Sequence, residues 1–272
     1  MSERDQATAE DEARETTTPT RAFVPDVPPT PSRPRASLGI VELVLDETQT
    51  VKAVGVVYGL EHTVRGKGYE ALLFLDQYNQ RIKILEYRAT DIHALVLRIR
   101  SLATANGLDK IIAMATHDDW QEFLRYGYVL EAVIRHYHRG EDAFVVSKFR
   151  SQERLTSTAL MEETLLIEQL MTSREPASPA PLPADYHIAF AERGDIPELV
   201  ALYADIFASY PSPLIHPSYL ETVFGDDTIF AVCRHGGAIV AAASIELHPG
   251  DLAAELTDCA TLKAHRLSLI HI

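Results

Sequence analysis

A proline-rich segment divides the sequence into two parts that must fold around separate cores. Residues 173–183 hold four prolines in eleven positions. Proline fixes φ and lacks a backbone N–H, so such a run forms neither a helix nor a central strand and acts as an extended spacer. We therefore expect a linker over 174–184, with a folded part on either side.

A second proline-rich stretch lies at the N-terminus. Residues 1–36 contain six of the fifteen prolines, together with many threonines, glutamates and arginines. Such a segment buries too little apolar surface to offset the conformational entropy lost on ordering. We expect 1–36 to be a disordered tail, and its charged beginning has no apolar stretch that would make it a secretory signal.

The composition of the chain excludes several classes of protein. Of the 272 residues, 46% are apolar and 24% are charged, which is typical of a globular protein. No apolar run approaches the ~18 residues that a membrane helix needs. The formal net charge of −14 disfavours a nucleic-acid partner, and the two cysteines, Cys233 and Cys259, suit a reducing compartment. We expect a cytoplasmic protein with neither a nucleic-acid partner nor a membrane partner.

The acidity is concentrated in the last third of the chain. Residues 185–272 hold twelve acidic and four basic residues, a formal charge of −8. An acidic domain attracts a cationic small molecule, although a solvated surface has the same composition.

Short apolar runs and amphipathic segments alternate over 37–150. Four β-like runs come first, and the later elements are a helix over 91–105, a strand over 108–115, a short helix over 117–126 and a hairpin over 128–149. The order β-β-β-β-α-β-α-β-β indicates an α/β fold with a mixed sheet. In the connecting segment 151–173, residues 154–172 predict one amphipathic helix, which we expect to pack between the two folded parts.

The part after the linker predicts the order β-α-α-β-β-β. Its helix has Asp195 as N-cap and Pro197 in the first turn. The predicted elements are a strand over 186–190, a second helix over 219–224, and strands over 228–234, 238–247 and 255–262.

Three stretches carry a resemblance to a known family. GYVLEAVIRHYHRGEDAFVVSKF (127–149), IFASYPSPLIHPSYL (206–220) and ELTDCATLKAHR (255–266) resemble, in this order, segments of the β-lysine N-acetyltransferases of the GNAT superfamily. The resemblance covers roughly residues 38–266. It implies a degenerate GNAT-like domain over 37–150 and an N-acetyltransferase domain over 185–272. The implied reaction transfers an acetyl group from acetyl-CoA to the ε-amine of β-lysine (3,6-diaminohexanoate), in compatible-solute synthesis or lysine degradation.

The resemblance stops at Arg266. In the family, a glycine-bearing loop follows and offers backbone N–H groups to the pyrophosphate of acetyl-CoA. This sequence continues with LSLIHI (267–272), which contains no glycine, so side chains stand where the family has bare backbone. We therefore expect an incomplete, inactive fragment whose last six residues are foreign coding sequence.

The resemblance also assigns binding residues. Ala260 and Leu262 offer backbone groups to the pantetheine arm of acetyl-CoA, and Arg266 begins the pyrophosphate loop. Tyr210 lies in the loop that roofs the acceptor pocket, where it contacts the substrate.

Acetylation requires a neutral amine, so a nearby group must remove a proton from the ammonium. Glu246 and Asp258 are carboxylates with apolar neighbours, where desolvation raises a pKa toward the working pH. We expect these two residues to be catalytic or to pair with the substrate ammonium, unless strand alternation turns one of them to solvent. Cys259 is expected to be a small buried side chain rather than an acyl carrier.

Two other functions stay open: acetylation of another small amine or polyamine, and a non-catalytic acyl-CoA-fold module used for interaction. No metal is expected, because His136 and His138 share a strand face without an evident third ligand.

Overall fold

The computed structural model describes residues 39–46, 48–55, 59–173, 181–225 and 227–266. The expected tail over 1–36, most of the predicted linker and the segment 267–272 lie outside these residues. Within the described part of the chain, no helix is long and apolar enough to cross a bilayer.

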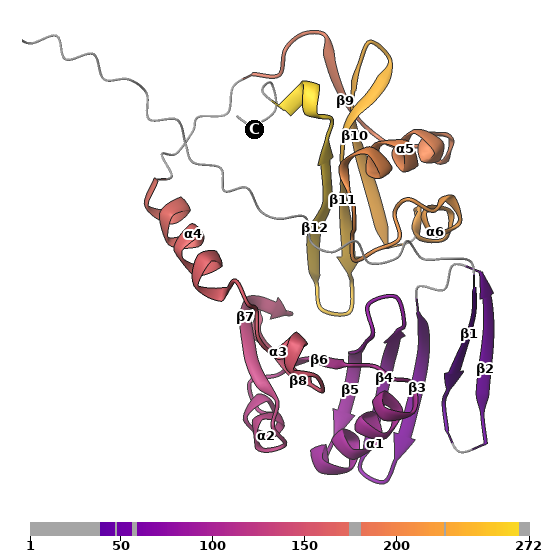
Figure 1. The fold of residues 1–272 in the computed structure, drawn as a ribbon, viewed down its shortest axis with the longest axis vertical. Coiled ribbons are helices and arrows are strands. Elements are labelled where there is room, and N and C mark those ends of the chain that lie inside the picture. The colour runs from indigo at the N-terminus through magenta and orange to yellow at the C-terminus, as the bar shows by residue number, and fades with distance from the viewer. Residues whose placement is uncertain (1–38, 47, 56–58, 174–180, 226, 267–272) are drawn as a thin grey trace, which may run out of the picture. The chain divides into compact units, whose positions relative to one another are not determined.

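The segment before the linker forms a six-stranded mixed sheet (Figure 1). Its strand order is β3-β4-β5-β6-β8-β7, in which β5 and β6 pair in parallel. The strands are β3 (Leu60–Gly66), β4 (Tyr69–Asp76), β5 (Arg81–Ala89), β6 (Lys110–Ala115), β7 (Val129–His138) and β8 (Glu141–Phe149). A separate antiparallel pair precedes it, β1 (Gly39–Val44) and β2 (Thr50–Gly55).

Helix α1 (Ile92–Ala105) makes the crossover that the parallel pair requires. The carboxylate of Asp91 accepts a hydrogen bond from the Ala94 N–H at 2.9 Å and caps the first turn. The apolar stripe of α1 is buried with the inward side chains of the sheet and with those of the short helix α2 (Trp120–Arg125). This stripe comprises Ile92, Leu95, Val96, Ile99 and Leu102.

The segment after the linker forms a four-stranded antiparallel sheet with the order β12-β11-β10-β9 (Figure 1). The strands are β9 (Tyr186–Phe190), β10 (Thr228–His235), β11 (Ala238–His248) and β12 (Ala253–Thr261). Helix α5 (Ile196–Ile206) buries Leu199 and Tyr203, and helix α6 (Pro217–Val223) buries Leu220, in a second core with Phe230 and Val232 of the sheet.

The expected mixed α/β class is confirmed, and most predicted elements lie within a few residues of the observed ones. Strand β3 is a correction, because four rather than five strands were expected before the first helix. β3 lies at the sheet edge and has one buried side chain, that of Val64. An edge strand whose side chains are mostly solvated needs no alternation of apolar and polar residues, so the hydrophobic pattern of the sequence does not predict β3.

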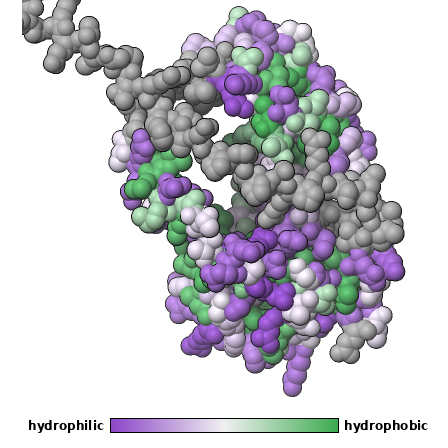
Figure 2. Space-filling view, in the orientation of Figure 1, coloured by the Kyte–Doolittle hydropathy of each residue, from purple (hydrophilic) through white to green (hydrophobic). Residues whose placement is uncertain are grey.

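The single connecting helix expected over 154–172 is also wrong. The structure has two helices, α3 (Gln152–Leu155) and α4 (Leu160–Ser173), separated by a break. The side chains over 160–172 are exposed, so α4 does not pack between the two sheets as expected. Figure 2 shows hydrophobic surface along this helix, which includes Met161 and Met171.

A buried ion pair holds the turn between β4 and β5. Asp76 is fully buried and accepts a hydrogen bond from Nε of Arg81 at 2.6 Å. We expect Asp76→Ala to lower the free energy of unfolding by about 3–5 kcal/mol, because it leaves Arg81 without its partner. Chemical denaturation measures this loss. The matched control is Glu70→Ala, which breaks an exposed pair with Arg65 and is expected to cost less than about 1 kcal/mol. Equal losses in the two variants would contradict the prediction.

Candidate functional site

Two carboxylates and an imidazole gather on neighbouring strands of the second sheet. Glu246 and His248 are two residues apart on β11, and Glu255 on β12 is the register partner of Glu246. Side chains at these positions project from one face of an antiparallel pair. Their ligating atoms all lie within 4.8 Å of one another. We call these three residues the acidic cluster.

The environment of Glu246 favours its protonated form. Burial raises the pKa of Glu246, and the negative charges of Asp258 and Glu255 raise it further, while Lys83 and His248 oppose the shift. A carboxyl with a raised pKa is a better proton acceptor near neutral pH than an exposed glutamate. Glu246 is therefore suited to take a proton from a bound ammonium.

Asp258 lies at a bulge in β12. The pairing shifts between Ala242 and Ser244, so that Asp258 and Cys259 together oppose one residue of β11, and Asp258 has a φ of 53°. The bulge directs the Asp258 carboxylate inward, where it is 3% exposed and accepts a hydrogen bond from Ser244 Oγ at 2.6 Å.

Tyr210 approaches the same bulge from the loop 207–216, between α5 and α6. Its hydroxyl accepts a hydrogen bond from the backbone N–H of Asp258 at 3.2 Å. Its ring stacks on Phe207, with 4.3 Å between ring centroids. The loop therefore fixes an aromatic side chain directly over the bulge.

Tyr203 on α5 adds an unpaired hydroxyl beside this site. The residue is fully buried, and among the described residues its oxygen has no hydrogen-bond partner. Burial raises the pKa of Tyr203, and the negative charge of Asp258 raises it further. The hydroxyl therefore stays protonated and is an available donor next to a buried carboxylate.

The first sheet also contributes to the site. Lys83 on β5 lies on the opposite face from the buried Ile82, and burial lowers the pKa of its ammonium. The carboxylates of Glu246 and Glu255 act on Lys83 in the opposite direction, so the three groups interact electrostatically. Carboxylates and imidazole are ligands that zinc accepts, and the nearby Lys83 ammonium offsets part of the negative charge of the acidic cluster.

Of the residues selected from the sequence, Asp258 and Tyr210 meet at the bulge, and Glu246 lies farther along β11, where the charge of Asp258 raises its pKa. The three assigned to acetyl-CoA lie at and beyond the end of β12. Ala260 is buried, the Leu262 N–H donates to the Val240 carbonyl at 2.9 Å, and the Arg266 Nε donates to the Thr261 carbonyl at 3.2 Å.

Among the residues that the structure describes, β12 pairs only with β11 in its sheet, so its outer edge can accept an added extended chain. This edge suits the pantetheine arm, whereas the segment expected to meet the pyrophosphate lies outside the described residues. The assignment of these residues to acetyl-CoA stays a prediction.

Several site residues escaped the sequence analysis. Ser244, Glu246 and His248 alternate along β11, and this spacing alone predicts that three polar side chains share one face of the strand. Tyr203 and Lys83 gave no such signal, since each reads as an ordinary helix or strand residue. Cys259 is a correction, because it is exposed rather than buried: it occupies the bulge on an edge strand.

Comparisons with known proteins identify distant relatives. No model of a known protein family matches the chain. The N-acetyltransferase YodP of Bacillus subtilis is 27% identical over 208 residues, which cover 75% of this chain and 74% of YodP. The β-lysine N(6)-acetyltransferase of Methanococcus maripaludis is 24% identical over 198 residues, which cover 72% of this chain and 71% of that enzyme. The chain is thus a distant relative of N-acetyltransferases.

A solved tandem GNAT protein from the clavulanic acid biosynthesis pathway matches with a TM-score of 0.43 and 12% identity. The match covers 77% of this chain and 65% of that protein, slightly less than two thirds of its length.

Tyr203→Phe tests the unpaired hydroxyl. We expect the free energy of unfolding of the ligand-free protein to rise by up to about 1 kcal/mol, because a buried hydroxyl without a partner is removed. The matched control is Tyr128→Phe, which removes another buried hydroxyl of the first core that has no partner among the described residues. Calorimetric titration should show weaker amine binding for the Tyr203 variant only. Equal binding by both variants would remove Tyr203 from the site.

Glu246→Gln tests the raised pKa. The pKa of Glu246 is higher in the folded protein than in the unfolded chain, where it is about 4.5. Ionisation of Glu246 therefore lowers the free energy of unfolding as the pH rises from about 4.5 through the pKa of the folded state. The variant should therefore match the wild type below that window and be more stable above it. Thermal unfolding from about pH 4 to about pH 8 measures the difference. Glu221→Gln, at an exposed position, is the control. A constant difference at every pH would contradict the prediction.

Proposed function

We propose that the chain carries the acceptor site of an acetyl-CoA-dependent N-acetyltransferase that acts on the ε-amine of β-lysine. The observation that carries this proposal is the contact of Tyr210 with the bulge at Asp258, whose charge also acts on the partly buried Glu246 of the neighbouring strand. Sequence similarity to an N-acetyltransferase and to a β-lysine N(6)-acetyltransferase supports the reaction and the substrate.

The first task of the site is to bind an ammonium. The buried Asp258 carboxylate supplies a fixed negative charge, and Tyr210 covers it from the loop 207–216. Charge interactions are stronger in such a partly desolvated place than in water. The unpaired Tyr203 hydroxyl, whose pKa the charge of Asp258 raises, would supply a further hydrogen-bond donor to the substrate.

The second task is to deprotonate that ammonium. Only the neutral amine has the lone pair that attacks a carbonyl carbon. Glu246, with its raised pKa, accepts the proton directly or through a water molecule. When bound, acetyl-CoA would supply the thioester carbonyl that the neutral amine attacks, and coenzyme A would leave as the thiolate and take up a proton. The open edge of β12 would hold its pantetheine arm.

The third task is to select the rest of the substrate. β-Lysine carries a second ammonium and a carboxylate close together. Glu255 of the acidic cluster complements that ammonium, and the Lys83 ammonium complements the carboxylate. A polyamine has no carboxylate for Lys83, which favours β-lysine over the alternative substrate class.

A non-catalytic acyl-CoA-fold module is the second candidate. In this case the chain would bind an amine without transferring an acetyl group to it.

The test combines binding with transfer. Calorimetry measures the binding of β-lysine, lysine and spermidine to the chain, and release of free thiol from acetyl-CoA measures the reaction. We expect β-lysine to bind most tightly, and its acetylation at the ε-amine would show an active enzyme and overturn the expectation of an inactive fragment. Amine binding without thiol release would favour the module, and lysine bound as well as β-lysine would overturn the substrate assignment.

Lys83→Gln tests the carboxylate contact. Loss of a charge-assisted hydrogen bond should weaken the binding of β-lysine by about 10-fold or more. The binding of spermidine should change by less than about twofold, because spermidine has no carboxylate. Lys52→Gln, at an exposed position on β2, is the control. Equal weakening for the two ligands would show that Lys83 acts on the charge of the cluster in general.

A further inference from the structure

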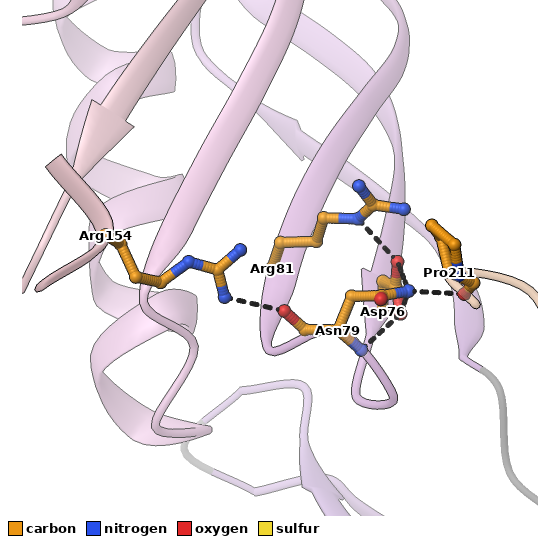
Figure 3. A network of polar contacts seen from close by, with 5 residues as sticks. All are labelled: Asp76, Asn79, Arg81, Arg154 and Pro211. Carbon is orange, nitrogen blue, oxygen red and sulfur yellow. Dashed lines mark hydrogen bonds and ion pairs between the residues drawn. The ribbon is translucent and has the colours of Figure 1, made fainter. Parts of the chain in front are cut away.

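The turn between β4 and β5 holds the side chain of Asn79 in a fixed orientation (Figure 3). Oδ1 of the buried Asp76 accepts hydrogen bonds from the Asn79 backbone N–H at 2.9 Å and from Asn79 Nδ2 at 3.0 Å. Arg81 anchors the same carboxylate, and Arg154 Nη1 donates to the Asn79 carbonyl at 2.7 Å. Both the backbone and the carboxamide of Asn79 are therefore restrained.

The carboxamide of Asn79 also reaches the second half of the chain. Its Nδ2 donates to the backbone carbonyl of Pro211 at 2.8 Å, as Figure 3 shows. A carboxamide nitrogen carries two hydrogens, so it can serve Asp76 and Pro211 at the same time. The contact joins residues 132 positions apart in the sequence.

Pro211 directly follows Tyr210 in the loop 207–216. Holding the Pro211 carbonyl restrains the backbone beside Tyr210, and the proline ring removes the freedom of φ at that position. The Tyr210 hydroxyl then accepts the hydrogen bond from the Asp258 N–H. A continuous chain of polar and covalent contacts thus runs from the buried Asp76 to the bulge at Asp258.

We propose that Asn79 is a positioning residue for the amine site. Its carboxamide holds the loop 207–216 at the distance where Tyr210 covers the bulge, so the first sheet orients part of the acceptor site. The kinetic consequence rests on the proposed function, whereas the effect on the loop does not.

The first measurement is kinetic. Asn79→Ala should raise KM for the amine by about 5-fold, the effect of one neutral hydrogen bond, and change kcat by less than about twofold. The matched control is Asn106→Ala. Asn106 makes hydrogen bonds with Val44 and Leu102 in the first half of the chain and has a similar structural role without contact to the loop. A KM raised equally in both variants would overturn the positioning role.

A double-mutant cycle with Tyr210→Phe shows whether Asn79 acts through Tyr210. In the Tyr210→Phe background, Asn79→Ala should add less than about twofold to KM, because the hydrogen bond that it positions is already lost. Fully additive effects would overturn the proposal.

Hydrogen exchange at the Asp258 amide provides a readout that needs no activity. Exchange should become about 5-fold faster in Asn79→Ala and stay unchanged in Asn106→Ala, since this amide donates to the Tyr210 hydroxyl. Unchanged exchange in both variants would overturn the positioning role. Faster exchange without acetyl transfer to any amine would uphold it and reject the proposed function.

Discussion

The pairing of β11 with β12 decides which side chains share the candidate site. Its antiparallel register sets Glu255 opposite Glu246, and the bulge rotates the Asp258 carboxylate toward the core on the α5 side. Without the bulge, the alternation of the strand would carry every following residue to the other face. Asp258 and Ala260 are both buried across this irregularity.

Electrostatics then give that arrangement its chemical character. Several carboxylates lie close together where burial limits their solvation, so the site favours a proton or another cation. The Lys83 ammonium of the first sheet lowers the pKa of Glu246, but it does not cancel the rise that burial and the neighbouring carboxylates cause. A bound ammonium would relieve the same repulsion. This need for positive charge makes a cationic substrate a better fit than an anionic one.

Contacts between distant parts of the chain refine the site further. The hydrogen bond from Asn79 to Pro211 joins a turn of the first sheet to the loop that carries Tyr210. Tyr137 on β7 lies beside His248 on β11, with 5.9 Å between their ring centroids. The first sheet therefore does more than support its own core.

The sequence by itself determined the mixed α/β class, most helices and strands, and the choice of Glu246, Asp258 and Tyr210. These features follow from local periodicity, capping and a resemblance of short motifs. Tertiary structure decided the edge strand β3, the break between α3 and α4, the exposure of Cys259 and the surroundings of Tyr203, Lys83 and Asn79. Each of these features depends on which residues from elsewhere in the chain pack against the element concerned. The neighbouring sequence therefore does not show whether a strand lies at a sheet edge, whether a helix lacks a packing partner or whether a hydroxyl is left unpaired.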